Sequence, residues 1–174
     1  MLLVVAATDR ELELVRAAET LVCGVGPVDA AASTARALAE RRPAGVLHVG
    51  LAGARGIEPP ALVLGSESVY GDAVDPASPF PRVVRVEPDA SLFERVRAAL
   101  PDALVRPIVT SGRIGSGGEV EAMEGFGVLR ACALAGVPAV ELRAISNDVD
   151  EADRANWRFD DALALLADAV ARVL

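Results

Sequence analysis

Short apolar runs separate longer mixed segments along the chain, a pattern typical of buried strands that alternate with covering helices. The first run, residues 2–7, is continuously apolar, as expected for a central strand with both faces buried. Further strands are predicted at residues 20–23, 44–50, 61–70, 104–110 and 137–145, with an edge strand at 82–86. Helices are predicted at residues 9–17, in the alanine-rich segment that ends near residue 41, and at 90–100, 119–135 and 152–174.

This alternation predicts a three-layer α/β/α fold with a mixed, largely parallel central sheet. A chain of 174 residues can bury such a core as a single domain, residues 1–174, and no repeat or linker divides it. Trp157, the only tryptophan, either packs in the core or stacks on a ligand. The apolar residues of the last predicted helix share one face, and they are Leu163, Leu166, Val170 and Val173.

A polar cluster, Ser146, Asn147 and Asp148, follows the strand predicted at residues 137–145. Ligands of α/β sheets bind at the carboxyl ends of strands, so this cluster is a candidate site by position. Glu124 is a carboxylate in an otherwise small and apolar predicted helix, where an unpaired charge is costly to bury. It must therefore face water or meet a partner.

Glu141 and Arg143 lie two residues apart on the same predicted strand and share one of its faces. The simpler interpretation is an ion pair with each other or with a neighbouring strand, which is structural and contributes little. A place for Arg143 in the site is the alternative.

Composition narrows the function classes. The formal net charge of −8 argues against a nucleic-acid partner, because neutralising phosphates takes clustered basic residues. All 17 basic residues are arginines, and without lysine the chain has neither Walker-type phosphate binding nor Schiff-base catalysis. Cys23 and Cys132 stand far apart without clustered histidines, so no metal site and no cofactor are expected. With His48 as the only histidine, in a predicted strand, a Ser/His/Asp hydrolase is disfavoured.

Apolar residues make up 52% of the chain, but no apolar run approaches the roughly 18 residues of a membrane span. We therefore expect no membrane partner. The first seven residues lack a basic flank, and Asp9, Arg10 and Glu11 follow closely, which favours a first strand over a signal peptide. The expected compartment is the cytoplasm.

Several fragments resemble one enzyme family. Residues 123–125 (Met-Glu-Gly), followed after a short turn by residues 137–147, are similar to a signature of the nucleoside phosphorylase and nucleosidase superfamily, most of all the futalosine hydrolases of menaquinone biosynthesis. The glycine-rich turn at residues 24–27 and the strand exit at residues 50–54 resemble the same superfamily. The resemblance implies a nucleoside phosphorylase-like fold, a purine nucleoside as small-molecule substrate, and assembly as a homodimer or higher homo-oligomer.

The resemblance also implies residue roles. Glu11, just after the first strand, matches the glutamate that activates the attacking water, although an acid in the first turn of a helix is also favoured by the helix dipole. Glu124 matches the residue that accepts hydrogen bonds from the ribose hydroxyls. Further substrate-binding positions are implied at Ala52, Gly53, Met123 and Ser146.

Asn147 occupies a position where adenine-specific relatives usually have an aspartic acid. A carboxylic acid helps adenine to leave by protonating N7, whereas a carboxamide can bridge N7 and O6 of a 6-oxopurine. This favours hypoxanthine, the base of futalosine, as the leaving group. Two alternatives stay open: Asp148 takes the acid's role, or Asn147 only caps the strand.

The chain departs from the family between Val109 and Glu119, where a longer segment with an aromatic residue normally covers the purine. This loss supports a further alternative, a shortened and non-catalytic homologue. An adenine nucleosidase or a phosphorylase is the other rival, although no N-terminal phosphate-binding pattern is visible. Because futalosine carries a benzoate, Arg55 and Arg113 are candidates to bind its carboxylate.

Overall fold

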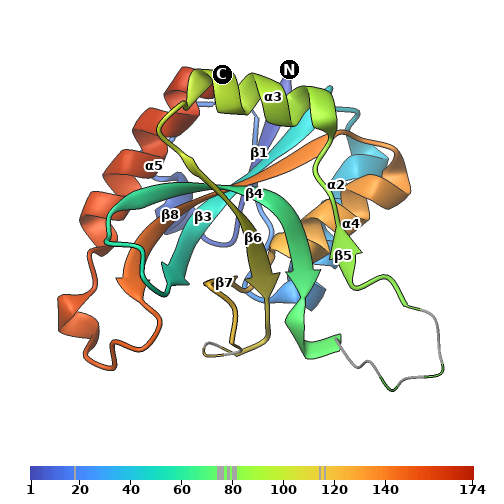
Figure 1. Cartoon of the computed structure of the whole chain (residues 1–174). Coiled ribbons are helices and arrows are strands. Elements are labelled where there is room, and N and C mark those ends of the chain that lie inside the picture. The colour runs from blue at the N-terminus through green and yellow to red at the C-terminus, as the bar shows by residue number, and fades with distance from the viewer. Residues whose placement is uncertain (18, 74–76, 78, 80–81, 114, 116) are drawn as a thin grey trace.

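The computed structural model describes residues 1–17, 19–73, 77, 79, 82–113, 115 and 117–174 (Figure 1). The strands are β1 (Leu2–Ala6), β2 (Thr20–Val22), β3 (Gly45–Ala54), β4 (Ala61–Tyr70), β5 (Arg85–Val86), β6 (Leu104–Thr110), β7 (Val120–Ala122) and β8 (Ala139–Asp148). The helices are α1 (Asp9–Leu12), α2 (Pro27–Glu40), α3 (Ala90–Ala99), α4 (Gly125–Ala135) and α5 (Phe159–Val173), with 3-10 turns η1 (Gly71–Ala73) and η2 (Arg154–Asn156). No helix of the described residues is long and apolar enough to cross a membrane.

The strands form one mixed sheet in which parallel pairings predominate among the described residues, as predicted. β1 lies between β2 and β3, parallel to both, and β3 runs parallel to β8 over most of its length. From β8 the hydrogen bonding continues to β4, β6 and β7, and β7 pairs back with β3. These five strands therefore close into a ring at one end of the sheet. Their side chains share a core cluster that includes Ala54, Val63, Ile108 and Ile145.

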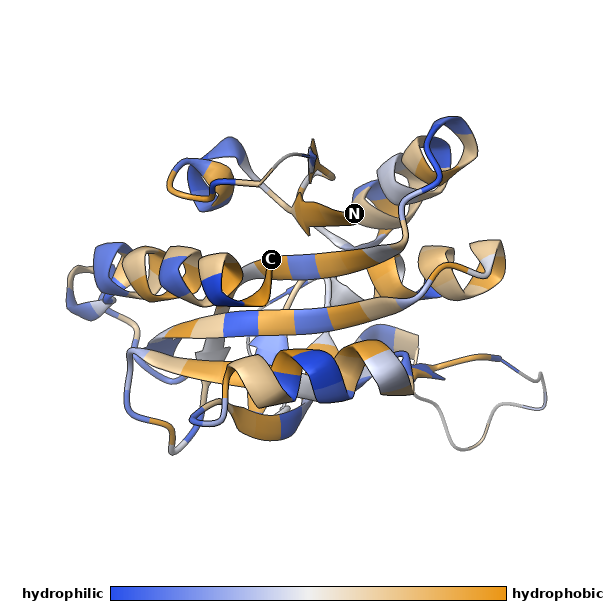
Figure 2. Cartoon of the chain, turned by 90° about the horizontal axis from the view of Figure 1, so that it is seen from above, coloured by the Kyte–Doolittle hydropathy of each residue, from blue (hydrophilic) through white to orange (hydrophobic). Residues whose placement is uncertain are grey.

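Helices cover both faces of the sheet and complete the predicted three layers (Figures 1 and 2). Side chains of β1 alternate: Leu2 and Val4 pack with α3 and α5, whereas Leu3 and Val5 pack with α2 and α4. Both faces of the first strand are thus buried, as its apolar run indicates. The predicted apolar face of the last helix is also confirmed, because Leu163, Leu166, Val170 and Val173 are all buried. Burying a side chain such as Leu166 contributes about 1.5–3 kcal/mol.

The helix predicted from Glu119 is wrong at its start. Residues 120–122 form β7, and α4 begins only at Gly125, with Glu124 as its N-cap residue. β7 is held by main-chain pairing to β3 on one side and β6 on the other, so tertiary pairing overrides the local pattern. The glycine-rich loop before it does not open a helix, since Gly115 and Gly117 have φ of 88° and 101°. Residue 116 of that loop lies outside the described residues.

The first helix is shorter than predicted and ends at Leu12 instead of residue 17. The amide of Val15 donates to the carbonyl of Leu12 at 3.0 Å, in a turn that places the Val15 side chain in the core. The last helix begins at Phe159 rather than residue 152, preceded by the single turn η2.

Candidate active site

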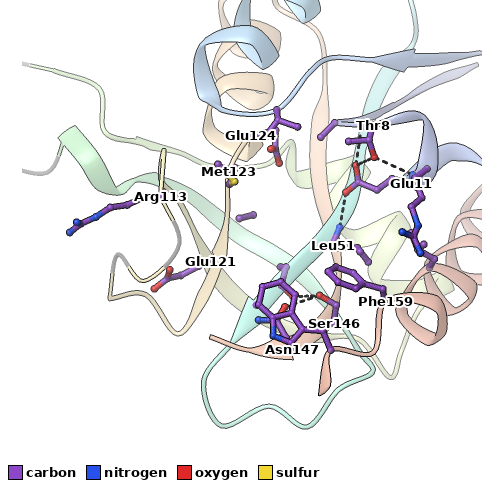
Figure 3. Close-up of a pocket in the computed structure, with 18 residues that line it drawn as sticks. Thr8, Glu11, Leu51, Arg113, Glu121, Met123, Glu124, Ser146, Asn147 and Phe159 are labelled. Atoms are coloured by element: carbon purple, nitrogen blue, oxygen red, sulfur yellow. Dashed lines mark hydrogen bonds between the residues drawn. The ribbon is translucent and has the colours of Figure 1, made fainter. Parts of the chain in front are cut away.

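A cavity of about 280 Å³ opens at the carboxyl ends of β1, β3 and β8, bounded by β7 and by the start of α5 (Figure 3). Its lining is mainly apolar with a few convergent polar groups, the usual character of a small-molecule site. Most of the residues proposed from the sequence line this one cavity, namely Glu11, Ala52, Gly53, Arg113, Met123, Glu124, Ser146 and Asn147. Arg55, Arg143 and Asp148 are not among its lining residues.

Glu11 enters the cavity from α1, where it also belongs to a capping box with Thr8. Its Oε2 accepts from the Thr8 amide at 3.0 Å and from the Thr8 hydroxyl at 2.9 Å. Its Oε1 accepts from the Leu51 amide at 3.0 Å, which ties α1 to the end of β3. The Glu11 side chain both caps the helix and faces the cavity, so its favourable place at the helix N-terminus does not exclude a catalytic role.

Glu124 faces the cavity from the start of α4 and is only 5% exposed. Its Oε1 accepts from the Gly26 amide at 3.2 Å, in the glycine-rich turn before α2. Its Oε2 lies 3.4 Å from Nη2 of Arg143. The buried charge that the sequence leaves unexplained therefore has partners on two other elements.

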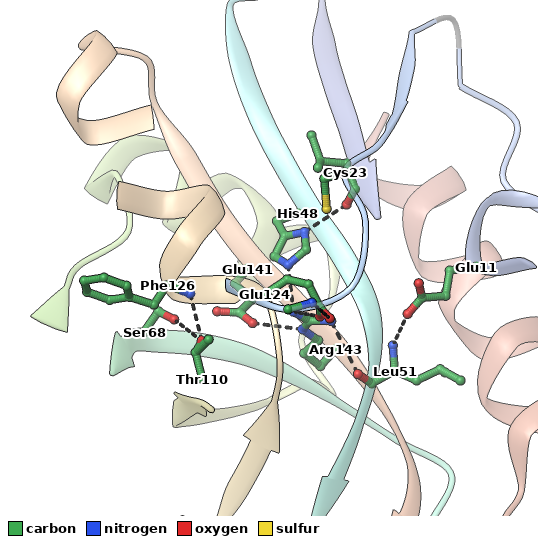
Figure 4. A network of polar contacts seen from close by, with 12 residues as sticks. Glu11, Cys23, His48, Leu51, Ser68, Thr110, Glu124, Phe126, Glu141 and Arg143 are labelled. Carbon is green, nitrogen blue, oxygen red and sulfur yellow. Dashed lines mark hydrogen bonds and ion pairs between the residues drawn. The ribbon is translucent and has the colours of Figure 1, made fainter. Parts of the chain in front are cut away.

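Arg143 is fully buried behind the cavity and connects several groups (Figure 4). Its Nε donates to Glu141 Oε1 at 2.8 Å, so the ion pair predicted from their shared face is present. Its other nitrogens reach Glu124 and the Leu51 carbonyl, the latter at 3.4 Å. Burial raises the pKa of Glu141, and the charge of Arg143 opposes that rise. We find Arg143 beside the site residues rather than in the cavity itself.

His48 is excluded as a general base by its surroundings. It is fully buried, and Arg143 Nη2 lies 2.7 Å from its Nε2. A guanidinium can only donate, so Nε2 accepts and Nδ1 carries the proton that goes to the Val5 carbonyl at 3.0 Å. Burial, followed by the charge of Arg143, lowers the pKa of His48 well below 6.5.

Both cysteines are buried free thiols. Burial raises the pKa of Cys23 and of Cys132 to about 12, which removes both as thiolate nucleophiles. Within the described residues, no group of three or more histidines, cysteines or acids could hold a metal ion.

Asn147 stands at the end of β8 with a fixed amide orientation. Its Nδ2 donates to the Asp148 carbonyl at 2.9 Å, and its Oδ1 accepts from the Ser146 hydroxyl at 2.8 Å. A carbonyl oxygen can only accept, which decides which end of the amide is nitrogen. Asp148 itself is exposed, and its carboxylate accepts from the Asp150 amide at 2.8 Å. The structure therefore places the amide, and not the neighbouring acid, in the cavity.

Arg55 is held away from the cavity by Glu121, a lining residue that sequence reasoning missed. The Arg55 guanidinium lies 2.7 Å from Glu121 Oε1 and also contacts Asp150. The amides of Gly115, Gly117 and Gly118 donate to the same Glu121 carboxylate at 2.6, 2.8 and 3.0 Å. The glycine loop thus binds a carboxylate of its own chain.

Other lining residues were also missed, and they are Ala7, Thr8, Arg10, Val25, Leu51, Ala122, Phe159 and Leu163. Only Thr8 carries a sequence signal, because threonine followed three residues later by glutamate is the capping-box pattern. Phe159 and Leu163 reach the cavity only through the docking of α5, which local sequence does not encode.

Comparisons with known proteins agree with this fold. The family model described as the phosphorylase superfamily matches residues 19–122. The chain is 38% identical over 186 residues to a futalosine hydrolase of Streptomyces coelicolor, covering 89% of this chain and 77% of the relative. The chain belongs to the phosphorylase superfamily. A second superfamily relative, a futalosine hydrolase of Thermus thermophilus, is 48% identical over 58 residues, which cover 33% of this chain and 26% of the relative.

Solved structures of a nucleosidase and of a futalosine hydrolase share the fold. The methylthioadenosine/S-adenosylhomocysteine nucleosidase of Neisseria meningitidis, in complex with methylthio-immucillin-A, superposes with a TM-score of 0.84 at 23% identity, covering 99% of this chain and 97% of that one. A futalosine hydrolase mutant of Helicobacter pylori gives a TM-score of 0.80 at 18% identity, covering 99% and 95%.

Proposed function

We propose that the protein hydrolyses the N-glycosidic bond of futalosine and releases hypoxanthine, as a step of menaquinone biosynthesis. The observation that carries this proposal is the convergence of Glu11, Glu124 and Asn147 on one cavity. The futalosine hydrolase of Streptomyces coelicolor, 38% identical to the chain, supports it.

The reaction makes three demands on a site. Breaking the bond develops oxocarbenium charge on the ribose and negative charge on the departing base, and water must be held below the anomeric carbon. In the proposed mechanism, the carboxylate of Glu124 stabilises the positive charge on the ribose, and the Asn147 amide stabilises the negative charge on the base. The carboxylate of Glu11 holds the water.

Glu11 is the group to hold and deprotonate water. Among the described contacts, its Oε2 accepts two hydrogen bonds from Thr8, whereas its Oε1 accepts one from Leu51. A carboxylate oxygen can accept about two hydrogen bonds. The remaining acceptor position of Oε1 is the place where water would bind.

Glu124 is the group to bind the ribose hydroxyls. Gly26 contacts one carboxylate oxygen of Glu124 and Arg143 contacts the other, and these contacts fix its orientation. Each of the two oxygens keeps an acceptor position for a ribose hydroxyl. Hydrogen bonds from the hydroxyls to a carboxylate strengthen as positive charge grows on the sugar. Met123, next to it in the lining, would pack on the sugar face.

Asn147 is the group to hold the base. Ser146 and Asp148 each use one hydrogen-bonding position of the amide, and one N–H and one oxygen lone pair remain for a ligand. The N–H can donate to O6 of hypoxanthine, where negative charge accumulates as the base leaves. A carboxylate at this position would instead repel O6.

The benzoate of futalosine needs a cation near the cavity. Arg113 and Arg10 are the arginines of the lining, whereas Arg55 is engaged by Glu121 and Asp150. Arg10 pairs with Asp160, but both side chains are more than 60% exposed (64% and 91%), so that pair is weak and easily exchanged. We therefore keep Arg113, add Arg10 and withdraw Arg55 as candidates for the carboxylate.

Hydrolysis is favoured over phosphorolysis by the charges of the cavity. The three carboxylates of its lining, Glu11, Glu121 and Glu124, outnumber the two arginines, Arg10 and Arg113, so the lining carries a net negative charge that would repel a phosphate dianion. The amides of the glycine loop, which could otherwise bind a phosphate, bind Glu121.

The test is a substrate panel. Purified protein is incubated with futalosine, inosine, methylthioadenosine and S-adenosylhomocysteine, with and without phosphate, and the free base is followed by chromatography. Phosphate-independent hypoxanthine release from futalosine is expected. Adenine release would instead favour a methylthioadenosine/S-adenosylhomocysteine nucleosidase, as the Neisseria meningitidis protein is named. No release of any base would favour a non-catalytic homologue.

We further expect a homodimer or higher homo-oligomer, in which a neighbouring copy helps to close the cavity. Sedimentation or light scattering measures the assembly directly, and a strictly monomeric and active protein would contradict this expectation.

A further inference from the structure

Trp157 is the only tryptophan of the chain, and it lines the cavity at the junction between η2 and α5. It is partly exposed, and the proposed reaction leaves it without a role. A large aromatic surface at the edge of a ligand cavity is a candidate for contact with a flat ligand.

Three contacts fix the indole. Its Nε1 donates to the Glu151 carbonyl at 3.1 Å, which satisfies its one polar group. The guanidinium carbon of Arg154 lies 5.4 Å from the ring centre, and the Phe159 ring lies 5.3 Å away at 51°. The ring is thus held in place before any ligand arrives, so little conformational entropy is lost on binding.

The position of Trp157 is tied to the base end of the cavity. The amide of the next residue, Arg158, donates to the Ser146 carbonyl at 2.7 Å, directly before Asn147 in β8. Phe159, whose ring centre is 5.3 Å from that of Trp157, also lies 6.0 Å from the guanidinium carbon of Arg10. Figure 3 shows Phe159 between Leu51 and the pair Ser146 and Asn147.

The loop at residues 111–119 cannot place an aromatic ring over the base. Residues 111–119 include no aromatic residue. Three of the loop's glycine amides point to the carboxylate of Glu121. A purine held by Asn147 therefore needs its aromatic contact from another element.

We propose that Trp157 stacks on the purine base that Asn147 holds, and so replaces the missing aromatic loop with a residue from the junction between η2 and α5. This inference rests on the proposed nucleosidase function. Stacking between a base and an aromatic side chain changes affinity by roughly 5- to 150-fold on removal of the ring.

The first arm of the test is fluorescence. Because Trp157 is the sole tryptophan, fluorescence excited selectively in tryptophan reports on this ring alone. Titration with hypoxanthine should quench the emission saturably, with a midpoint equal to the dissociation constant from calorimetry. Titration with ribose should leave the emission unchanged.

The second arm is calorimetry on variants. Trp157→Leu should weaken hypoxanthine binding at least about 5-fold, and Trp157→Phe should retain most of the affinity. Phe93→Leu is the control, because it removes an aromatic ring of α3 that packs against the core outside the cavity lining, and it should leave the affinity for the free base unchanged.

The inference is overturned if hypoxanthine binds the wild-type protein without quenching, if Trp157→Leu binds it as tightly, or if Phe93→Leu weakens binding equally. The substrate panel separates this failure from that of the proposed function. If adenine is the released base, futalosine hydrolysis is wrong, and adenine becomes the titrant for the same two arms. If neither base binds, the stacking proposal is wrong, and the substrate panel alone decides the proposed function.

Discussion

Thr8 offers a sharp test of how the site holds its water-activating carboxylate. Its hydroxyl lies 2.9 Å from Glu11 Oε2 and also accepts from the Glu11 amide, in the capping box of α1. Thr8→Val keeps the shape of the side chain and removes both hydrogen bonds. Loss of the cap should destabilise the fold by about 1 kcal/mol.

The effect on activity is a separate quantity. A hydrogen bond to a charged group contributes about 1.5–3 kcal/mol, and the partial exposure of Thr8 and Glu11 places this one at the lower end. If the bond orients Glu11 for the attack by water, kcat should fall about 10-fold. KM should change little, because Thr8 acts through Glu11 and not on the bound substrate.

A matched control separates the two effects. Asp89 caps α3, where its carboxylate accepts from the Leu92 amide at 2.8 Å, and it does not line the cavity. Asp89→Ala should lower the urea midpoint as Thr8→Val does, yet keep wild-type kcat, whereas Thr8→Ser should keep both. Equal losses of kcat in Thr8→Val and Asp89→Ala, or none in Thr8→Val, would refute the positioning argument.

Four further predictions follow from particular contacts. Glu11→Gln should reduce kcat for base release about 10²- to 10⁴-fold, as expected for loss of a general base; wild-type activity would remove Glu11 from the mechanism. Asn147→Asp should shift the released base from hypoxanthine toward adenine in the substrate panel, and an unchanged preference would show that another residue selects the base. Gly125→Ala should lower the free energy of unfolding by about 1–3 kcal/mol, because its Cβ would clash with both carboxylate oxygens of the buried Glu141; a gain, as helix propensity alone predicts, would contradict this packing. His48 is held neutral in the folded state, whereas the unfolded chain protonates it below about pH 6.5. Its contribution to stability is thus present above that pH and lost as pH falls, by up to about 1.4 kcal/mol per pH unit, and this slope should be absent from urea unfolding of His48→Gln.

The sequence is informative wherever burial on both faces leaves a continuous apolar run. β1 and the apolar face of α5 could be predicted because each is a long and regular pattern. β7 could not, because three residues give no periodicity and the strand exists only through its pairing with β3 and β6. The misplaced start of α4 follows from the same cause.

Some residues of the candidate site could be predicted from the sequence, and others could not. Glu11, Glu124 and Asn147 stand beside recognisable fragments, so the resemblance indicates them directly. Arg10 and Phe159 carry no such signal, because they meet at the cavity only after α5 docks beside α1. The engagement of Arg55 by Glu121 is equally invisible, since the two residues are far apart in the chain.

Arg143 explains how three carboxylates can gather at one end of the sheet. Glu141 and Glu124 contact its guanidinium at 2.8 and 3.4 Å, and the charge of Glu11 also acts on it. A Cβ at Gly50 would clash with both Arg143 Nη1 and Glu11 Oε1, so the glycine allows these two groups to approach across β3. One buried cation thus offsets repulsion that would otherwise drive the carboxylates apart. Arg143 thus supports the arrangement of these carboxylates from behind the cavity, although it is not among the lining residues.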